Sequence, residues 1–421
     1  MAKAVSNTEK ELAEHFFRNE YGKMVAVVAK YLGTAPIETA EDLVQDTLLA
    51  AVEHWQRHGI PDNPAGWLYT TVKNKTFNIL KHEKYKHLLN EMMDSDESES
   101  VGFSDEEIAD DQLRMMYACC HPGIGEEVQL TLILKILCGF SAAEIAAAFF
   151  TNTETINKRL VRGRKKLKIA ELSLDSIKLT ASTDVVLKSI YLLFNEGYSP
   201  SKKSRLVRTE LSLEAIRLAK LVVFHPMMTH LADGHALLSL MYLNASRFEA
   251  RINEENLVLE MEKVDRSKWN KDLIDLGLAH LENAQKGDKI SGYLIMAGIS
   301  AHHCIAPSLA ETDWHEILKL YDAWLKLEDQ PVIRLNRAVV LSKVFGTEPA
   351  LVELLALKSQ GKLKKNHLLY LTIGELYLHS GELDKAIVHY KTALEVCQNE
   401  RDLTFLNKKL ETAVLISKTQ L

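Results

Sequence analysis

Apolar residues recur at the three- and four-residue spacing of helices along most of the chain. In its first part they run from Phe16 to Tyr31 and again from Leu43 to Trp55. Residues 58–64 interrupt this pattern, and the proline that ends them suits the first turn of a helix beginning near Ala65. Beyond residue 180 the pattern is helical throughout. The chain is therefore predicted to be all-α.

Composition supports this prediction. The 421 residues include only 19 Gly and 9 Pro, too few for collagen-like or turn-dense all-β architectures, and 47% are hydrophobic, which suits several cored domains. Five Cys over this length and the lack of a charged-then-apolar leader argue against a secreted disulfide scaffold. No apolar run approaches the roughly 18 residues that span a bilayer, so a cytoplasmic protein without membrane contact is predicted.

Charge is divided into opposed blocks that the net value of −6 conceals. Residues 91–111 contain ten acidic residues and no Lys or Arg, whereas residues 152–168 contain seven basic residues and one acid. Residues 91–105 are also poor in large apolar side chains, so they are predicted to form a flexible acidic linker. A plain solvated tether and a segment that follows basic channels of a partner are both open at this point.

Residues 141–168 have the spacing of a helix-turn-helix. Ser141 with Glu144 and Thr151 with Glu154 have capping-box spacing, which predicts short helices beginning at 141 and 151. In the second helix an apolar stripe faces inward and the cations face outward, which fits the DNA major groove. The predicted DNA-reading residues are Thr155, Lys158, Arg159, Arg162, Lys165 and Lys166. A solvated basic face is the alternative that the charges alone leave open.

The C-terminal part contains an internal repeat signal. Small and aromatic residues fall at the spacings of a tetratricopeptide helix pair, in which small residues let the helices approach and aromatics fill the gap. These positions are Tyr370, Ile373, Gly374, Tyr377, Gly381, Ala386, Tyr390 and Ala393. Residues 333–343 and 350–357 are predicted as a degenerate preceding pair, and residues 403–418 as a capping helix.

Three helical segments with distinct outer faces follow one another along the first 171 residues. Ala40–Ala51 carries an acidic face, Pro64–Lys81 carries Lys and Asn on its outer side, and residues 140–167 form the helix-turn-helix. They resemble the core-polymerase-binding helix, the −10 element helix and the −35 promoter-reading unit of bacterial sigma-70 family RNA polymerase sigma factors, extracytoplasmic-function (ECF) subfamily. The match covers about residues 1–171 and has that subfamily's two-domain layout. It implies core RNA polymerase and promoter DNA as partners and no cofactor.

The resemblance assigns roles to two helical faces. Asp42, Gln45, Asp46 and Leu49 share one face of the 40–55 helix and are the predicted contacts to core polymerase. The predicted −10 contacts, with Lys for phosphates and Asn for base edges, are Asn63, Lys73, Asn74, Lys75, Asn78 and Lys81. The loop from His58 to Gly66 is expected to capture a flipped −10 base. Trp67 is predicted to lie in the core, and a solvated acidic face is the alternative for the 40–55 helix.

The predicted domains are sigma region 2 (1–90), the linker (91–105), sigma region 4 (106–171), a helical extension (180–330) and tetratricopeptide-like repeats (331–421). Local patterns resemble a group of the subfamily with such an extension: Cys119–Pro122, Leu193–Tyr198, Arg247–Arg251, Asp265–Trp269 and Pro331–Ala338. The extension is expected to regulate the sigma factor, with a protein or ligand partner. The patterns at 195–198 and 265–269 are read either as structural junctions or as a ligand site.

Chemistry of other kinds is not predicted. The groups Cys119–His121 with Cys138, His225 with His230, and His302–Cys304 lack paired metal-ligand spacing, so no metal is expected. Motifs for nucleophilic catalysis and phosphate binding are missing, so the chain is predicted not to be an enzyme. The alternatives are a tetratricopeptide adaptor with an operator-binding helix-turn-helix, and a helical enzyme in 180–330 fused to a DNA-binding module.

Overall fold

The computed structural model describes residues 7–33, 37–82, 104–149, 151–169, 177, 179, 183–198, 207–228, 231–251, 264–397 and 400–419. Within these residues every regular element is helical and no strand is present, so the all-α prediction is confirmed. None of the described helices is long and apolar enough to cross a membrane. Most of the predicted acidic linker, 91–105, lies outside the described residues.

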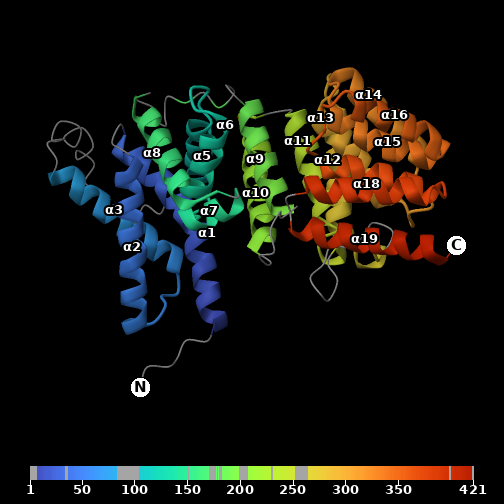
Figure 1. The fold of residues 1–421 in the computed structure, drawn as a ribbon. Helices are drawn as coiled ribbons and strands as arrows, with labels where there is room; N and C mark the ends of the chain where they lie inside the picture. The colour runs from blue at the N-terminus through green and yellow to red at the C-terminus, as the bar shows by residue number, and fades with distance from the viewer. Residues whose placement is uncertain are drawn as a thin grey trace. The chain divides into compact units, whose positions relative to one another are not determined.

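Contacts divide the chain into two compact units, which are described separately (Figure 1). Unit 1 comprises residues 1–193 and 220–229, and unit 2 comprises residues 194–219 and 230–421. The helices of unit 1 are α1 (Asn7–Leu32), α2 (Ile37–His58), α3 (Pro64–His82), α5 (Asp105–Cys119), α6 (Glu126–Leu132), a π-helical turn η1 (Ile133–Leu137), α7 (Ala142–Ala148) and α8 (Thr153–Ile169). Helices α9 (Thr183–Tyr198) and α10 (Val207–Val223) contribute residues to both units.

Helices α1, α2 and α3 pack on one another as the N-terminal module of unit 1. The predicted interruption of the helical pattern is confirmed, because α2 ends at His58 and α3 begins at Pro64. The side-chain oxygen of Asn63 accepts a hydrogen bond from the Gly66 amide at 2.9 Å and caps α3.

Aromatic rings join the three helices of the N-terminal module. The ring of Trp55 on α2 stacks on Phe17 of α1 at 5.5 Å and meets Trp67 of α3 edge-on at 5.8 Å. Trp67, which was expected in the core, is half-buried in this cluster. Its neighbour Leu68 is fully buried, so the apolar side of α3 faces the module as its pattern predicts.

Helices α5, α6, α7 and α8 form the second module of unit 1, which we call the helix-turn-helix module after the motif predicted at residues 141–168. The predicted capping box at the start of α7 is confirmed, since Ser141 and Glu144 bond each other's backbone amides. The predicted capping box of the next helix is wrong: α8 begins at Thr153, and the side chain of Asn152 accepts from the Thr155 amide at 2.8 Å. Asn is at least as good a cap as Thr, and it moves the cap by one residue, from Thr151 to Asn152.

The two modules of unit 1 pack directly on each other (Figure 1). Among the described side chains, ion pairs cross this contact at three places: Arg18–Glu144 at 2.7 Å, Lys30–Asp111 at 2.9 Å, and Arg164–Glu41. At Gly22 of α1 a Cβ atom would lie 1.9 Å from the carbonyl oxygen of Leu137, so α1 reaches η1 this closely only without a side chain. We call these contacts the module joint.

The beginning of α9 packs on the helix-turn-helix module. The hydroxyls of Tyr117 and Thr183 lie 2.9 Å apart, and the Lys188 ammonium pairs with Glu126 at 2.6 Å. Deeper in the contact the Cys120 thiol donates to Ser189 at 3.7 Å. Unit 1, as its contacts define it, therefore includes the first part of the predicted extension, residues 180–193. The limits of the predicted domains 106–171 and 180–330 stay predictions.

Unit 2 is a series of helices in which neighbours along the chain pack together. They are α11 (Ala232–Ala245), α12 (Lys271–Gln285), α13 (Gly292–Ile305), α14 (Trp314–Leu327), α15 (Pro331–Phe345), α16 (Thr347–Ser359), α17 (His367–His379), α18 (Leu383–Val396) and α19 (Glu400–Thr419), with 3₁₀ turns at Glu249–Arg251 and Arg266–Lys268. A Cβ atom on Gly374 of α17 would lie 2.7 Å from the ring of Tyr390 on α18. The predicted pairing of a small residue with an aromatic ring is therefore present between these two helices.

Asp265–Trp269 forms a structural junction in unit 2. Asp265 caps the 3₁₀ turn through the Ser267 amide at 3.0 Å. The next residue, Arg266, donates to the carbonyl oxygens of His303 and Ala306 at 2.9 and 2.6 Å, where α13 ends. Its guanidinium also lies 4.9 Å from the ring centre of Trp269. Cations at a helix C-terminus satisfy unpaired carbonyls, which gives this motif a structural role.

Candidate nucleic-acid and polymerase interfaces

The outer face of α8 is exposed and mostly cationic. Lys158, Arg162 and Lys165 are exposed, and the side chain of Val161 between them is 64% exposed. With Glu154 and Asn157, three of these residues line a shallow hollow of about 300 Å³. On the opposite side Ile156 and Leu160 are buried. The inward and outward sides of α8 therefore divide as its sequence predicts.

Two of the predicted DNA-reading cations already have protein partners in unit 1. Arg159 is half-buried and pairs with Glu127 of α6, while Lys166 is exposed and donates to the carbonyl oxygen of Gly123. Thr155 is half-buried, and its backbone amide is the one that Asn152 caps. All six predicted residues therefore lie on one helix. Lys158, Arg162 and Lys165 are the most accessible of them. Lys158 makes only an exposed ion pair within α8, with Glu154 at 2.7 Å.

The predicted polymerase-binding face of α2 is solvent-exposed. Asp42, Gln45 and Asp46 are exposed, and the side chain of Leu49 is 60% exposed. The reverse side of the helix is buried, including the fully buried Thr47, whose hydroxyl donates to the Leu43 carbonyl at 2.8 Å. An exposed leucine surrounded by polar side chains matches the apolar centre and polar rim of protein interfaces.

The predicted −10 residues lie along α3 and its cap. Asn74 and Asn78 are exposed, whereas Lys73 is half-buried with its ammonium 5.9 Å from the ring centre of Phe77. Lys75 donates to the backbone carbonyl of Asp46 at 2.8 Å, which ties α3 to the predicted polymerase face. Lys81 lies on α3 at a position whose side chain is outside the described set. Asn63 is exposed at the N-terminal cap of α3, where its side chain accepts a hydrogen bond from the Gly66 amide. This hydrogen bond gives the Asn63 side chain a structural role.

Glu41 and Arg164 form the most buried part of the module joint, and the sequence patterns did not single out either residue. The side chain of Glu41 is 3% exposed, pairs with Arg164 of α8 and accepts from the Tyr21 hydroxyl at 3.2 Å. Burial raises the pKa of Glu41, and the Arg164 guanidinium opposes that rise. Helical spacing offered one signal for Glu41, because it is three residues before the buried Val44 and so lies on the same side of α2.

Burial or an ion pair accounts for several of the Cys and His residues considered for metal binding, and His230 lies outside the described residues. Cys119, Cys120 and Cys138 are buried, and burial raises the pKa of Cys119 and brings that of Cys120 to about 12. His225 lies 3.0 Å from the Asp110 carboxylate. Among the described residues, none of these groups brings three ligand atoms close enough together to hold one ion.

Comparisons with known proteins bear on both units. Residues 16–84 match the sigma-70 region 2 family, and residues 182–285 match a family of unknown function, DUF6596. Over 385 residues the chain is 28% identical to an uncharacterized protein of Rhizobium meliloti (strain 1021). The aligned residues cover 89% of this chain and 90% of that protein. No solved structure matches the chain.

The region 2 match covers the elements that carry the α2 and α3 candidate residues. Sigma-70 region 2 supports a sigma factor role in promoter recognition, and it implies binding to core RNA polymerase and promoter DNA. The sigma-70 family consists of transcription initiation factors rather than enzymes. Residues 182–285, whose family has no known function, include the Asp265–Trp269 junction.

Proposed function

We propose that the chain is a sigma factor of the ECF subfamily, with α8 reading the −35 element and α3 with its preceding loop opening the −10 element. The observation that carries this is the exposed cationic face of α8, Lys158, Arg162 and Lys165, in the same packed unit as the region 2 match. Arg and Lys on a helix in the major groove make bidentate contacts to guanine, and the remaining cations hold phosphates.

The exposed face of α2 supports core polymerase as the second partner. An operator-binding regulator has no use for an exposed acidic face tied to a second DNA-binding helix, whereas a polymerase subunit needs both. Asp42, Gln45, Asp46 and Leu49 remain accessible although the opposite side of α2 is buried in unit 1. The hydrogen bond from Lys75 to the Asp46 carbonyl would couple polymerase docking to the position of α3.

In this proposal, unit 1 with its two modules packed together is a closed form that must open at the module joint before both promoter elements can be bound. The −35 and −10 elements lie about 25 base pairs apart, or roughly 85 Å along B-form DNA. A compact unit of roughly 200 residues has a radius of gyration of only about 17 Å. Helices α8 and α3 therefore cannot read both elements while the modules stay packed. Binding to polymerase and promoter is expected to separate them at the module joint.

Run-off transcription with core polymerase and a promoter library tests the proposal. Wild type is expected to start at a defined promoter class, and Arg162→Ala with Lys165→Ala to lose initiation by roughly 10- to 100-fold, since each base contact is worth about 1–3 kcal/mol. Leu49→Asp is expected to abolish core binding while leaving duplex binding intact. Lys391→Ala, an exposed cation on α18, is the matched control.

The outcome separates the rival functions. Sequence-specific duplex binding without any initiation in the presence of core polymerase would replace the sigma factor with an operator-binding tetratricopeptide adaptor. Equal activity of the Arg162/Lys165 variant and the Lys391 control would remove α8 as the reading helix.

Regulation by the C-terminal extension is part of the same proposal. The start of α9 contacts α5 and α6 through Tyr117–Thr183 and Lys188–Glu126, so the extension is attached to the helix-turn-helix module. A chain ending at Thr229 retains every residue of unit 1. We expect that truncation to change promoter-dependent transcription, and an unchanged rate with an unchanged response to the inducing signal would show that residues 230–421 do not regulate it.

A further inference from the structure

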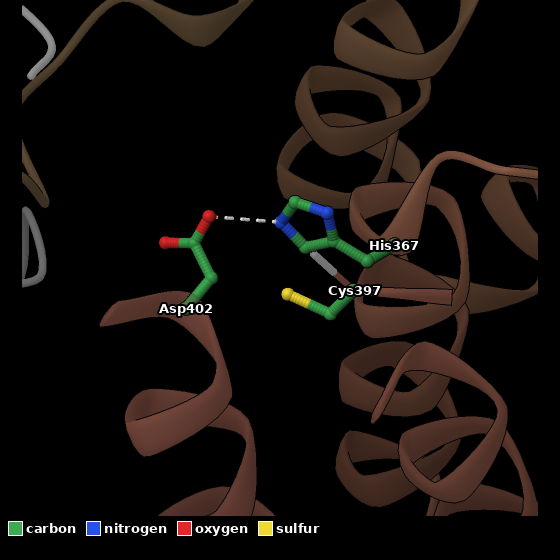
Figure 2. Close-up of side chains that lie close together, drawn as sticks. All are labelled: His367, Cys397 and Asp402. Atoms are coloured by element: carbon green, nitrogen blue, oxygen red, sulfur yellow. Dashed lines mark ion pairs between the residues drawn. The ribbon is translucent and has the colours of Figure 1, made fainter. Parts of the chain in front are cut away.

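His367, Cys397 and Asp402 lie close together at the ends of three successive helices of unit 2 (Figure 2). His367 is the first residue of α17, Cys397 follows α18, and Asp402 lies in the first turn of α19. One ligand atom from each residue lies within 4.8 Å of the other two. The imidazole Nε2 and the carboxylate Oδ2 are 3.2 Å apart.

We propose that these three side chains bind a zinc-class divalent ion. Zinc takes imidazole nitrogen and carboxylate oxygen at about 2.1 Å and thiolate sulfur at about 2.3 Å, so neighbouring ligand atoms of a tetrahedral site lie roughly 3.4–3.7 Å apart. The His367–Asp402 separation is already of that size, and closing the remaining separations needs a shift of about 1 Å.

The donor set selects the class of ion. Nitrogen, sulfur and oxygen together suit a borderline ion such as Zn²⁺, whereas Mg²⁺ and Ca²⁺ require oxygen ligands throughout. Three protein ligands leave a fourth tetrahedral position for water or another group. The spacing of these residues in the sequence does not predict a metal site, because His367 is thirty residues from Cys397 along the chain.

The surroundings of the three side chains favour a bound cation. The Nε2 atom of His367 is buried and makes no well-formed hydrogen bond, although the Asp402 carboxylate is nearby. Cys397 is a buried, reduced thiol in an apolar cluster with Tyr370, Ala393 and Leu406. An apolar shell around a metal site excludes water and strengthens the metal–ligand interactions.

The cap of α17 holds the histidine in place. Asn366 accepts a hydrogen bond from the Leu368 amide at 2.9 Å, and the Tyr370 hydroxyl donates to the Lys364 carbonyl at 3.2 Å. These bonds fix the turn that positions His367. Because each ligand comes from a different helix, the ion would fasten α19 to the α17–α18 pair, and the site does not depend on the proposed transcription function.

The test uses the full chain, stripped with a chelator and titrated with Zn²⁺ and with Co²⁺ as a spectroscopic probe. We expect one Zn²⁺ per chain and an upward shift of roughly 2–5 °C in the unfolding midpoint of unit 2. Co²⁺ is expected to give a thiolate-to-metal charge-transfer band and the intense visible bands of tetrahedral coordination. Cys397→Ser should remove the charge-transfer band, and His367→Gln should weaken Zn²⁺ binding at least about tenfold.

The control is His379→Gln, which changes an exposed histidine at the other end of α17 and should bind Zn²⁺ as the wild type does. Circular dichroism of each variant confirms that α17–α19 remain folded. Absence of Zn²⁺ binding to the wild type would overturn the proposal. A charge-transfer band that persists in Cys397→Ser, or an equal loss of Zn²⁺ binding in His379→Gln, would overturn it as well.

Discussion

The module joint of unit 1 and the α17–α18 pair of unit 2 both use a glycine for close approach, but they bury opposite kinds of side chain. At the joint, Gly22 faces a backbone carbonyl, and the buried partners include the carboxylates of Glu41 and Asp111. In the helix pair, Gly374 faces the ring of Tyr390, which is fully buried in an apolar cluster. Buried carboxylates thus distinguish the joint, whereas a buried ring distinguishes the helix pair.

This difference indicates which contact can open. A buried ion pair contributes little net stability, because desolvation of both charges offsets their attraction, and water can replace the partners on separation. Separating α17 from α18 would expose apolar surface at about 25 cal/mol for each Å², with no compensation. Unit 1 is thus suited to separation of its modules, and the end of unit 2 is suited to staying packed.

Tyr390→Ala should have the largest effect. The side chain is 0% exposed and donates a hydrogen bond to Glu375 at 2.7 Å, so its removal leaves a cavity and takes one hydrogen bond away from Glu375. We expect a loss of about 3–5 kcal/mol in the unfolding free energy of this region. Hydrogen exchange read by mass spectrometry should show loss of protection in α17, α18 and α19.

Val388→Ala on the same helix is the control, because that side chain is 58% exposed and its truncation should change stability by no more than about 0.5 kcal/mol. Protection in unit 1 should be unchanged in both variants. Equal loss of protection in α1–α8 of Tyr390→Ala would mean that the hydrophobic and ionic regions do not respond separately.

Glu41→Gln should have the next largest effect and should act on the joint alone. It keeps the shape of the side chain but leaves Arg164 without its buried charge partner, and breaking one member of a buried pair costs up to about 3 kcal/mol. We expect faster amide exchange in α1 and η1, and higher initiation at limiting sigma concentration. Glu38→Gln is the matched control, since Glu38 is 47% exposed and lies 3.9 Å from Arg164.

Gly22→Ala reaches the same joint without changing a charge. The new Cβ would collide with the Leu137 carbonyl oxygen, while alanine favours the α1 helix itself by up to about 1 kcal/mol. The N-terminal module should therefore keep its stability as the joint opens. Increased exchange of α1–α3 amides in general, rather than of the joint, would contradict this separation of effects.

The fold was largely predictable because local rules decide it. Helical periodicity, the break before Pro64 and the Ser141 capping box are short-range features, and each is confirmed. The cap of α8 was misplaced by one residue, since Thr151 and Asn152 are both good caps and the sequence alone does not rank them. Contacts between distant segments, such as Glu41 with Arg164, have no short-range signature.

The candidate sites show the same limit. Exposure of Lys158, Arg162 and Asp42 followed from the opposite buried stripe of each helix. Engagement of Arg159 by Glu127 depends on how α6 packs against α8, and nothing in the spacing of either helix reveals it. The roles of these residues in binding DNA or polymerase remain predictions.

The smallest effect concerns a half-buried ionisable group of unit 2 whose charged neighbours among the described residues, unlike those of Glu41, carry no opposite charge. Burial, with Arg247, Arg266 and His302 nearby, lowers the pKa of His303 from its ordinary value near 6.5 to about 4. The folded form therefore keeps this imidazole neutral where the unfolded chain would protonate it. Its contribution to stability is complete above pH 6.5 and is lost as the pH falls through 6.5 toward 4.

This loss should amount to about 1–2 kcal/mol at pH 5, because each pKa unit corresponds to about 1.36 kcal/mol and partial solvent access reduces the effect. Denaturant unfolding at pH 7.5 and pH 5 measures it through Trp314, whose ring centre lies 5.4 Å from that of His303. His303→Gln should remove that part of the pH dependence, and His302→Gln should keep it. An equal pH dependence in wild type and His303→Gln would show that the folded protein does not hold this imidazole neutral. An ionisable group without an opposite charge beside it would then make the unfolding free energy no more sensitive to pH than an ion-paired group such as Glu41.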